Sequence, residues 1–416
     1  MIVWGGFAVS SVGTALSNLA VPVLALGLSG SPAVAGLVGA ARLAPYLLLT
    51  LLAGVFVDRW DRRRVMLVAD LGRFAVLATI PVAYAFGVLT VTHLAVVAFL
   101  EGVGHVFSAV SHLSALPKLV PEEQLASANA LNEVADSAAG VGGSALSGAL
   151  IGLARNSTLG AVYSYAVDAV TYLLSGASLL LVRTSFQEQR PAGERRSVTA
   201  DLKEGMAFLR RQRLLRLLVV MVTLVNFLQA PLHLATLVLA TEDLGVNAGL
   251  IGLVLAAVGL GSVGSAFAAS WLRERIGLRT LALGSVAVWT VAAAVMATAP
   301  SLVLLAAGVL LTNLLWPIFA VSLVTYRLSA TPDHLQGRVN SAFRTLSFGV
   351  EPLGLAIGGV LIASQGPRFL FWTAAAGQFV ILVGGTAAWR RKRMPGTGGV
   401  APLKDTSGRP RTPEDP

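Results

Sequence analysis

The chain has 416 residues, of which 55% are hydrophobic and 12% are charged, and its mean hydropathy is +0.74. Soluble domains carry about 25% charged residues, so the composition excludes a soluble protein and indicates an integral membrane protein. The net charge of +10 does not indicate a nucleic-acid partner, because the basic residues lie in short segments between apolar runs. Zero cysteines exclude disulfides, thiolate metal sites and cysteine nucleophiles.

Apolar runs, each long enough to cross ~30 Å of hydrocarbon as a helix, follow one another along the chain. The first run opens the sequence and is too long for a signal-peptide core, so we expect a retained helix. The predicted helices span residues 3–28, 32–57, 65–87, 92–113, 128–154, 158–183, 215–240, 247–271, 279–299, 301–326, 340–363 and 367–389.

The polar segment 184–214 separates six of these runs from the other six. It therefore predicts two helical bundles, residues 1–183 and 215–389. Within the linker, residues 198–214 have the pattern of an amphipathic helix on the inner membrane face. The Pro- and Gly-rich residues 390–416 predict a disordered cytoplasmic tail.

The two halves resemble one another in sequence. A shift of 211 positions pairs Gly143 with Gly354 and Gly148 with Gly359, so the fifth run matches the eleventh. Such pairing indicates a parallel duplication, which is one way in which transporter folds are built.

Basic residues gather in alternate loops. They include the run Arg62 to Arg64, the cluster from Arg183 to Arg216 and the run Arg390 to Arg393. The positive-inside rule then predicts a multi-pass protein of the cell (inner) membrane with both termini in the cytoplasm.

The loop between the second and third runs reads Gly-Val-Phe-Val-Asp-Arg-Trp-Asp-Arg-Arg-Arg from Gly54 to Arg64. Gly54 permits close approach of a neighbouring helix, and Asp58 places a carboxylate at membrane depth that needs a partner. Asp70 and Arg73 lie three residues apart and can extend this network.

This loop resembles the signature loop of the major facilitator superfamily, and the resemblance extends over the whole chain. Residues 116–132 and 337–344 are similar to the branch that contains enterobactin exporters and macrolide efflux proteins. The resemblance implies an all-α membrane protein with twelve transmembrane helices in two pseudo-symmetric six-helix bundles.

In that family the aspartate at the Asp58 position meets the N-terminal end of the eleventh helix and helps to hold the outward-facing state. The resemblance thus implies a conformational latch formed by Gly54, Asp58, Arg59, Arg62, Arg63, Asp70, Arg73 and Asn340. Two features depart from the family pattern: the arginine of proton-coupled exporters is missing from residues 93–104, and the second loop copy, residues 271–279, has no aspartate.

Charged residues within the spans form a second set of candidates, since each costs ~3 kcal/mol or more at the bilayer centre and tends to face a cavity or a partner. Arg42, Glu101 and Glu351 fall near mid-depth, Asp136 is shallower, and His105 follows Glu101 by one helical turn. We expect these residues to couple protons or bind substrate. A buried ion pair between Arg42 and a carboxylate is the structural alternative.

The resemblance ranks these residues above Asp168, because the sixth helix is peripheral in the family. Neutral polar residues within the spans, namely Asn18, Asn226, Gln229 and Asn313, are candidates for substrate hydrogen bonds or for bonds between helices.

Residues 259–264 match the dinucleotide pattern G-x-G-x-x-G, but no strand precedes them and close helix packing explains them better. With no P-loop, histidine metal cluster or nucleophile elbow in the sequence, we expect neither an enzyme nor a cofactor.

The predicted function is export of a small, largely apolar molecule of the drug, macrolide or siderophore type by alternating access, in exchange for protons. The expected partners are the small-molecule substrate, protons and the lipid bilayer, with no nucleic acid, and the chain is expected to be a monomer. Uptake or facilitated diffusion is the alternative within the same fold, and a non-transporting membrane sensor is the alternative from another class.

Overall fold

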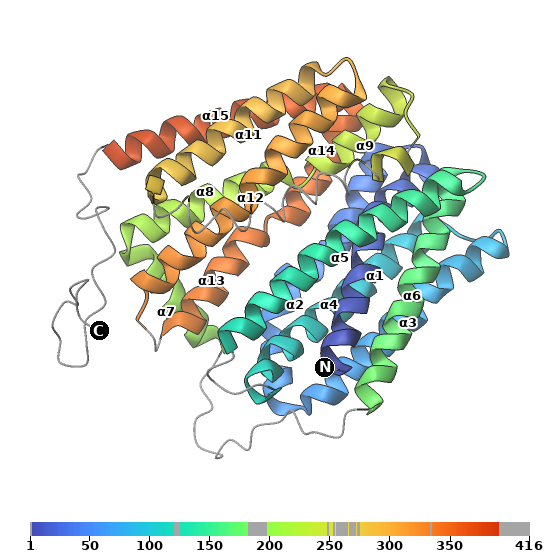
Figure 1. Ribbon diagram of the computed structural model, residues 1–416, viewed down its shortest axis with the longest axis horizontal. Helices are drawn as coiled ribbons and strands as arrows, with labels where there is room; N and C mark the ends of the chain where they lie inside the picture. Colours follow the sequence, from blue (N-terminus) through green and yellow to red (C-terminus); the bar gives the residue numbers. More distant parts are fainter. Residues whose placement is uncertain are drawn as a thin grey trace.

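The computed structural model describes residues 2–119, 125–181, 198–247, 249–252, 275–332 and 335–390, together with the single residues 254, 265 and 272. Within these residues the chain forms helices joined by short turns and contains no strand (Figure 1). Most of the predicted eighth span, residues 184–197 of the linker and the tail from residue 391 lie outside the described residues.

The N-terminal half follows the predicted spans closely. Its helices are α1 (Ile2–Ser29), α2 (Pro32–Arg59), α3 (Arg62–Ala85), α4 (Val91–Leu119), α5 (Leu125–Leu153) and α6 (Ser157–Leu181). Asp61 caps the third of these, because its side chain accepts a hydrogen bond from the Arg64 backbone N–H at 2.9 Å.

The C-terminal half begins with the predicted amphipathic segment. Its elements are α7 (Val198–Arg211), α8 (Arg213–Gln229), α9 (Leu232–Val238), the π-helical turn η2 (Leu239–Asp243), α11 (Leu278–Thr298), α12 (Leu302–Ala330), α13 (Gln336–Phe348), α14 (Glu351–Gln365) and α15 (Pro367–Arg390). Ten helical stretches of the described residues are long and apolar enough to cross a membrane, and residues 138–153 add a shorter apolar helix. The all-α fold predicted from the sequence is confirmed.

Two predicted spans are interrupted. The seventh breaks between α8 and α9, where Pro231 has no N–H to donate to the helix. The eleventh breaks at Gly349 and Val350, and Pro352 then sits in the first turn of a new helix, a position that suits proline.

The two breaks lie against each other. A Cβ atom on Gly354 would meet the Phe227 carbonyl oxygen, and one on Gly358 would meet the Pro231 ring. Near the breaks, Asn226 Nδ2 donates to the Ser347 carbonyl oxygen at 2.9 Å. Backbone groups freed by the interruption of the eleventh span are thus partly satisfied by the seventh.

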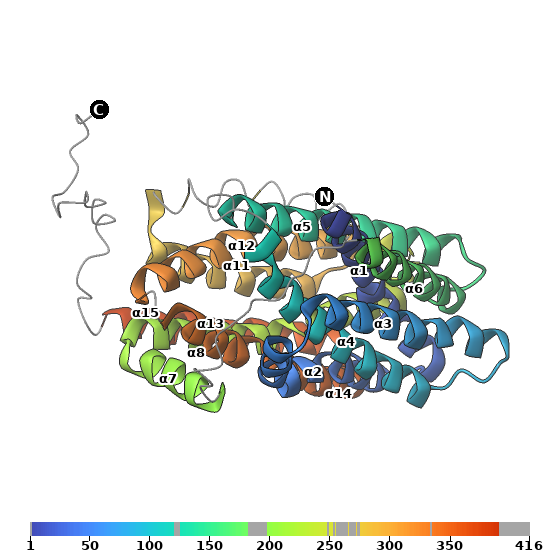
Figure 2. The ribbon, with the colours of Figure 1, turned by 90° about the horizontal axis from the view of Figure 1, so that it is seen from below.

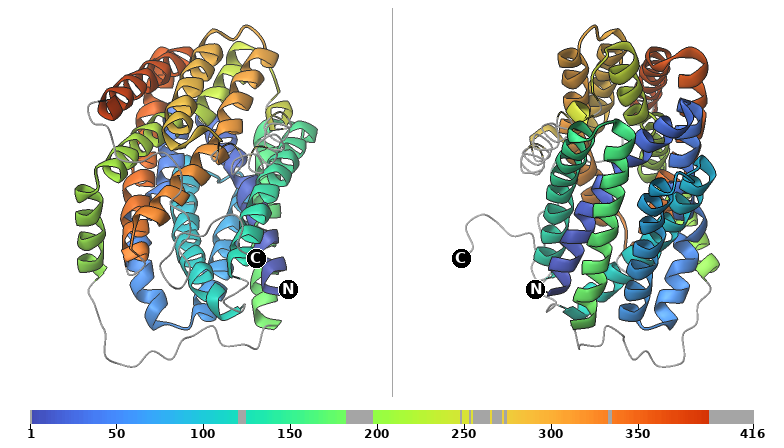
Figure 3. Two further views of the ribbon diagram at one scale, coloured as in Figure 1. Left: turned by 60° about the vertical axis from the view of Figure 1, so that its left-hand side comes forward. Right: turned by 90° about the vertical axis from the view of Figure 1, so that its right-hand side faces the viewer.

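The helices run side by side between two ends of the molecule (Figure 3). We call one of them the turn end, where residues 30–31, 86–90, 154–156, 244–247, 299–301 and 366 connect neighbouring helices. The opposite end, which carries the α2–α3 connection and α7, is the loop end. Figure 2 shows α2 beside α14, so the two halves meet along this pair.

A single buried apolar cluster joins both halves near the turn end. It includes Leu24 and Val38 of the N-terminal half and Leu237, Ile362 and Phe371 of the C-terminal half. A second apolar cluster lies within the C-terminal half around Trp289. Among the described residues, buried apolar packing thus connects the halves near the turn end.

Candidate functional site

Three charged side chains meet inside the N-terminal half, and we call them the central ion-pair cluster. Arg42 Nε of α2 lies 2.7 Å from Glu101 Oε2, and Arg73 Nη2 of α3 lies 2.5 Å from Glu101 Oε1. Glu101 is only 2% exposed and Arg73 only 4%. One carboxylate of α4 therefore connects two other helices.

Glycines on α4 permit this approach. A Cβ on Gly102 would meet the Arg42 carbonyl oxygen and would lie 3.1 Å from Pro45 Cγ, whereas one on Gly104 would lie 2.5 Å from Arg73 Cγ. The sequence Glu-Gly-Val-Gly from Glu101 thus combines the shared carboxylate with two surfaces on which neighbouring helices can pack closely.

Polar groups of four further residues surround the cluster. Asn18 Oδ1 of α1, an exposed residue, accepts from Arg42 Nη1 at 2.7 Å. The Tyr172 hydroxyl accepts from Arg73 and is 2.7 Å from Thr14 Oγ1, while His105 Nδ1 is 3.4 Å from Arg73 Nη2. The Arg73 guanidinium also lies 3.7 Å from the centre of the Tyr172 ring, a cation–π geometry.

Asp168 lies beside this cluster but contacts hydroxyl groups rather than cations. The Ser17 hydroxyl of α1 donates to Oδ2, and Thr171 Oγ1 lies 3.5 Å from Oδ1. Asp168 is fully buried, because α6 packs along α1 and α3 and turns this face inward. The family resemblance ranked Asp168 below the other candidate site residues. Tyr165 and Tyr172 lie on the same face of α6 as Asp168, and this spacing in the sequence could have indicated that the face is buried and polar.

Three of the predicted latch residues contact other groups of the N-terminal half. Asp70 accepts from Ser175 Oγ at 2.7 Å and lies 3.5 Å from Ser108 Oγ, whereas Arg73 joins the central ion-pair cluster. Arg63 donates to the carbonyl oxygens of Leu179 and Leu180 at the end of α6.

The rest of the predicted latch is only partly visible. Arg62 is buried at the start of α3, and Asn340 is half-buried in α13. The environment of Gly54 and the side chains of Asp58, Arg59 and Asp136 lie outside what the structure describes. The contact predicted between the Asp58 region and Asn340 therefore stays a prediction.

The polar candidates of the C-terminal half do not form a comparable cluster. Asn226 is buried, and its side chain donates a hydrogen bond to a neighbouring helix. Asn313 Nδ2 donates to the Val309 carbonyl oxygen of its own helix at 2.8 Å. Gln229 Nε2 is buried and has no hydrogen-bond partner among the described residues. Glu351 is half-buried in the first turn of α14, directly after the break, and no described residue forms a hydrogen bond or ion pair with its carboxylate.

Glycines bring the two halves into backbone contact near the turn end. A Cβ on Gly36 of α2 would lie 2.6 Å from the Leu355 carbonyl oxygen and 2.8 Å from Gly359 Cα of α14. A Cβ on Gly148 of α5 would lie 2.7 Å from Gly252 Cα and 2.8 Å from the Gly249 carbonyl oxygen. Gly148 and Gly359, which the sequence repeat pairs, thus each lie at a backbone contact between the halves.

This fold, with its paired halves and its buried charges, is that of the major facilitator superfamily, a class of membrane transporters. The chain belongs to the transmembrane secretion effector family, whose model matches residues 1–355. The family resemblance inferred from the signature loop is thereby confirmed.

Relatives agree with this assignment. The multidrug efflux pump Tap of Mycolicibacterium fortuitum is 28% identical over 374 residues, which cover 87% of this chain and 88% of Tap. Macrolide efflux protein A of Streptococcus pyogenes is 25% identical over 231 residues, 56% of each chain. Among solved structures, a bacterial homologue of the human lysosomal transporter Spinster, in an inward-facing and unoccupied conformation, has a TM-score of 0.76 at 13% identity and covers 95% of this chain and 98% of its own.

Proposed function

We propose that the chain exports a small, largely apolar molecule by alternating access of its two halves, in exchange for protons. The observation that carries the proposal is the backbone contact of the halves through Gly36, Gly148 and Gly359, because such a contact has to open and close if substrate is to pass between the halves. The efflux activity in the names of the relatives supports export.

The direction of closure follows from the loop charges. The turn end carries few basic residues, whereas the loop end carries Arg62 to Arg64 and the basic residues of α7, so we place the turn end outside the cell. The conformation is then closed to the outside and corresponds to the inward-facing state. The similarity to the Spinster homologue, whose structure is inward-facing, supports this assignment.

We assign the central ion-pair cluster to positioning rather than to proton transfer. Protonating Glu101 would leave two buried guanidinium groups without their common counter-ion, which is costly. Glu101 therefore holds Arg42 and Arg73 in place. Arg42, whose side chain is 12% exposed, and the exposed Asn18 then present polar groups to the substrate.

Asp168 is better suited to exchange a proton. A hydroxyl group donates to a carboxylate and accepts from a protonated carboxyl, so Ser17 can serve both states of Asp168. The charged groups that act on it from the neighbouring helices are Glu101 of α4, Arg73 of α3 and Arg42 of α2. Glu351 is the second candidate, because the described residues give its carboxylate no cationic partner.

We expect Asp168→Asn to abolish accumulation driven by a pH gradient while substrate counterflow without a gradient continues, because the asparagine keeps the shape but cannot exchange a proton. The measurement uses proteoliposomes loaded with labelled erythromycin or ethidium. Asp243→Asn, a surface carboxylate 3.2 Å from Arg368, is the control and should retain both activities. Unchanged pH-driven accumulation in Asp168→Asn would show that the proton site lies elsewhere.

The latch is retained as a proposal in which Asp58 meets the Asn340 end of α13 when the loop end closes. Asp58→Asn should then reduce erythromycin efflux at least tenfold while the purified protein keeps its unfolding temperature. Wild-type efflux by this variant would exclude the latch.

A further inference from the structure

The helix α7 carries a group of basic side chains that the transport cycle described above does not use. Within residues 202–217, the exposed basic residues are Lys203, Arg210, Arg211, Arg213 and Arg216. The one carboxylate of this stretch, Glu204, is already 2.6 Å from Arg338 of α13. No described carboxylate forms an ion pair with any of the five cations.

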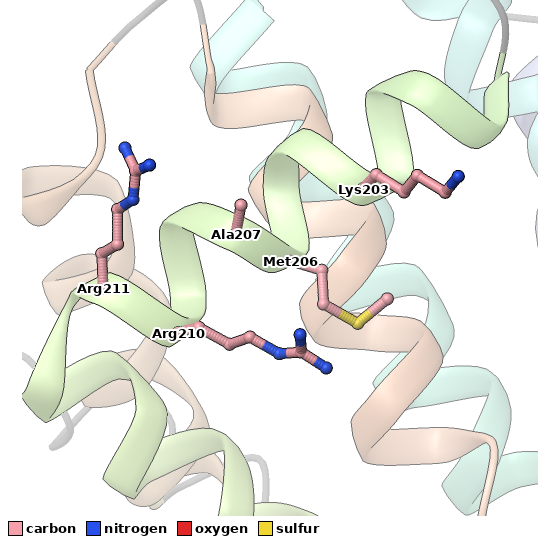
Figure 4. Close-up of a pocket in the computed structure, with 5 residues that line it drawn as sticks. All are labelled: Lys203, Met206, Ala207, Arg210 and Arg211. Atoms are coloured by element: carbon pink, nitrogen blue, oxygen red, sulfur yellow. The ribbon is translucent and has the colours of Figure 1, made fainter.

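Part of this group lines an open hollow on α7, whose lining residues are Lys203, Met206, Ala207, Arg210 and Arg211. Figure 4 shows Arg211 extending to a different side of the helix from Arg210. Arg210 and Met206 lie one turn apart and extend to the same side of the helix (Figure 4). The hollow thus combines guanidinium and ammonium donors with an apolar thioether. This combination suits a phosphate group that is attached to an apolar body.

The opposite face of α7 is apolar and packs against the protein. Leu209 is 2% exposed and belongs to the same buried cluster as Val339 and Phe343 of α13. A Cβ on Gly205 would meet the Arg338 carbonyl oxygen, so the backbones of α7 and α13 touch. Because this face is occupied, the basic face is the one that remains for a ligand.

The position of α7 specifies the source of the phosphate. Gln212 alone separates α7 from α8, whose first residue, Arg213, begins the membrane-crossing stretch Arg213–Asp243. The basic face therefore lies at the level where that span enters the membrane, at the end with most loop arginines. Headgroups of the cytoplasmic leaflet are present there at high local concentration, and clusters of Lys and Arg beside a span attract anionic lipids.

We propose that the hollow on α7 binds the phosphate of an anionic phospholipid, held by Arg210, Arg211 and Lys203. Met206 and Ala207 contact the apolar part of the lipid. Because α7 is fixed to α13 through Glu204 and Gly205, the bound lipid also holds the loop-end half of the interrupted eleventh span. The binding step is independent of the proposed function, and only its effect on transport rests on that function.

The test compares two double variants that remove equal charge at the same end of the molecule. Arg210→Gln with Arg211→Gln alters the hollow. Arg279→Gln with Arg390→Gln removes two exposed arginines from α11 and α15 and is the control. Binding of phosphatidylglycerol and of phosphatidylcholine to the purified chain is measured by native mass spectrometry, and circular dichroism confirms that each variant is folded.

We expect the chain to bind phosphatidylglycerol more tightly than phosphatidylcholine. The variant in the hollow should weaken phosphatidylglycerol binding roughly tenfold or more, since each basic residue near a membrane surface contributes about 1 kcal/mol. The control should bind as the wild type does. Equal loss in both variants, equal binding of the two lipids, or complete displacement of the lipid by 50 mM inorganic phosphate would each overturn the proposal, the last because it indicates a site for free phosphate.

The effect on transport is measured separately. Erythromycin efflux by the wild type should be faster in vesicles that contain phosphatidylglycerol than in vesicles of phosphatidylcholine alone, and the variant in the hollow should lose this difference. If lipid binding behaves as expected but no vesicle supports efflux, the proposed function fails and the lipid site stands.

Discussion

Glu101→Gln is expected to abolish efflux and to destabilise the chain, because Arg42 and Arg73 lose the carboxylate that both contact. Removing one partner of a buried ion pair typically costs about 3–5 kcal/mol. The measurement is reversible unfolding of the purified protein in mixed micelles, together with erythromycin efflux from vesicles.

A second substitution distinguishes loss of charge balance from loss of packing. Adding Arg73→Gln to Glu101→Gln removes one of the two uncompensated cations, so we expect part of the stability to return while efflux stays absent. Asp243→Asn breaks the exposed pair with Arg368 and should cost about 1 kcal/mol or less. Wild-type stability and efflux in Glu101→Gln would show that the central ion-pair cluster is dispensable.

Gly148→Leu is expected to hold the turn end open and to lower efflux at least tenfold. Even a Cβ at this position would lie 2.7 Å from Gly252 Cα, so a leucine cannot be accommodated while α5 keeps its present contact. Overpacking costs about 1–3 kcal/mol, which shifts an equilibrium between two conformations roughly fivefold to 150-fold.

The absence of cysteine in the chain makes this change directly measurable. Cysteines at the exposed positions Arg155 and Glu242 place one spin label on each half at the turn end. Pulsed electron paramagnetic resonance should give a longer label separation in Gly148→Leu than in the parent. Gly142→Leu is the control, because a Cβ there has no neighbour within 4 Å. An unchanged separation with unchanged efflux would contradict the proposal that the contact at the turn end opens and closes during transport.

The helices of the fold were predictable because a helix that crosses the bilayer must be apolar over the thickness of the hydrocarbon, whatever other helices it packs against. The breaks at Pro231 and Gly349 were not predicted, since hydropathy continues through them and the compensating contact, Asn226 with the Ser347 carbonyl, joins distant segments. The sequence thus predicts how many spans there are and how deep a residue lies in the membrane, but not whether a span is one unbroken helix.

The contacts within the candidate site were predictable only in part, because they too depend on how helices that are distant in the sequence pack together. An ion pair of Arg42 with a carboxylate was foreseen, because two mid-depth charges of opposite sign need each other. Arg73 was assigned to the signature loop from its distance along the chain, yet the rotation of α3 directs it to Glu101. The complete burial of Asp168 was not predicted for the same reason, since only packing shows that its face of α6 turns inward.

The paired helix breaks also imply that the helices of the C-terminal half bend more easily than those of the N-terminal half. Ion pairs and hydroxyl bonds connect α1, α2, α3, α4 and α6, whereas the C-terminal half has two adjacent helix breaks with Gly354 and Gly358 packed against the first of them. We therefore expect the N-terminal half to move as a rigid body and the C-terminal helices to bend at the two breaks during the transport cycle. Random substitutions that change the speed of the cycle without changing its direction should then accumulate around residues 227–231 and 347–358.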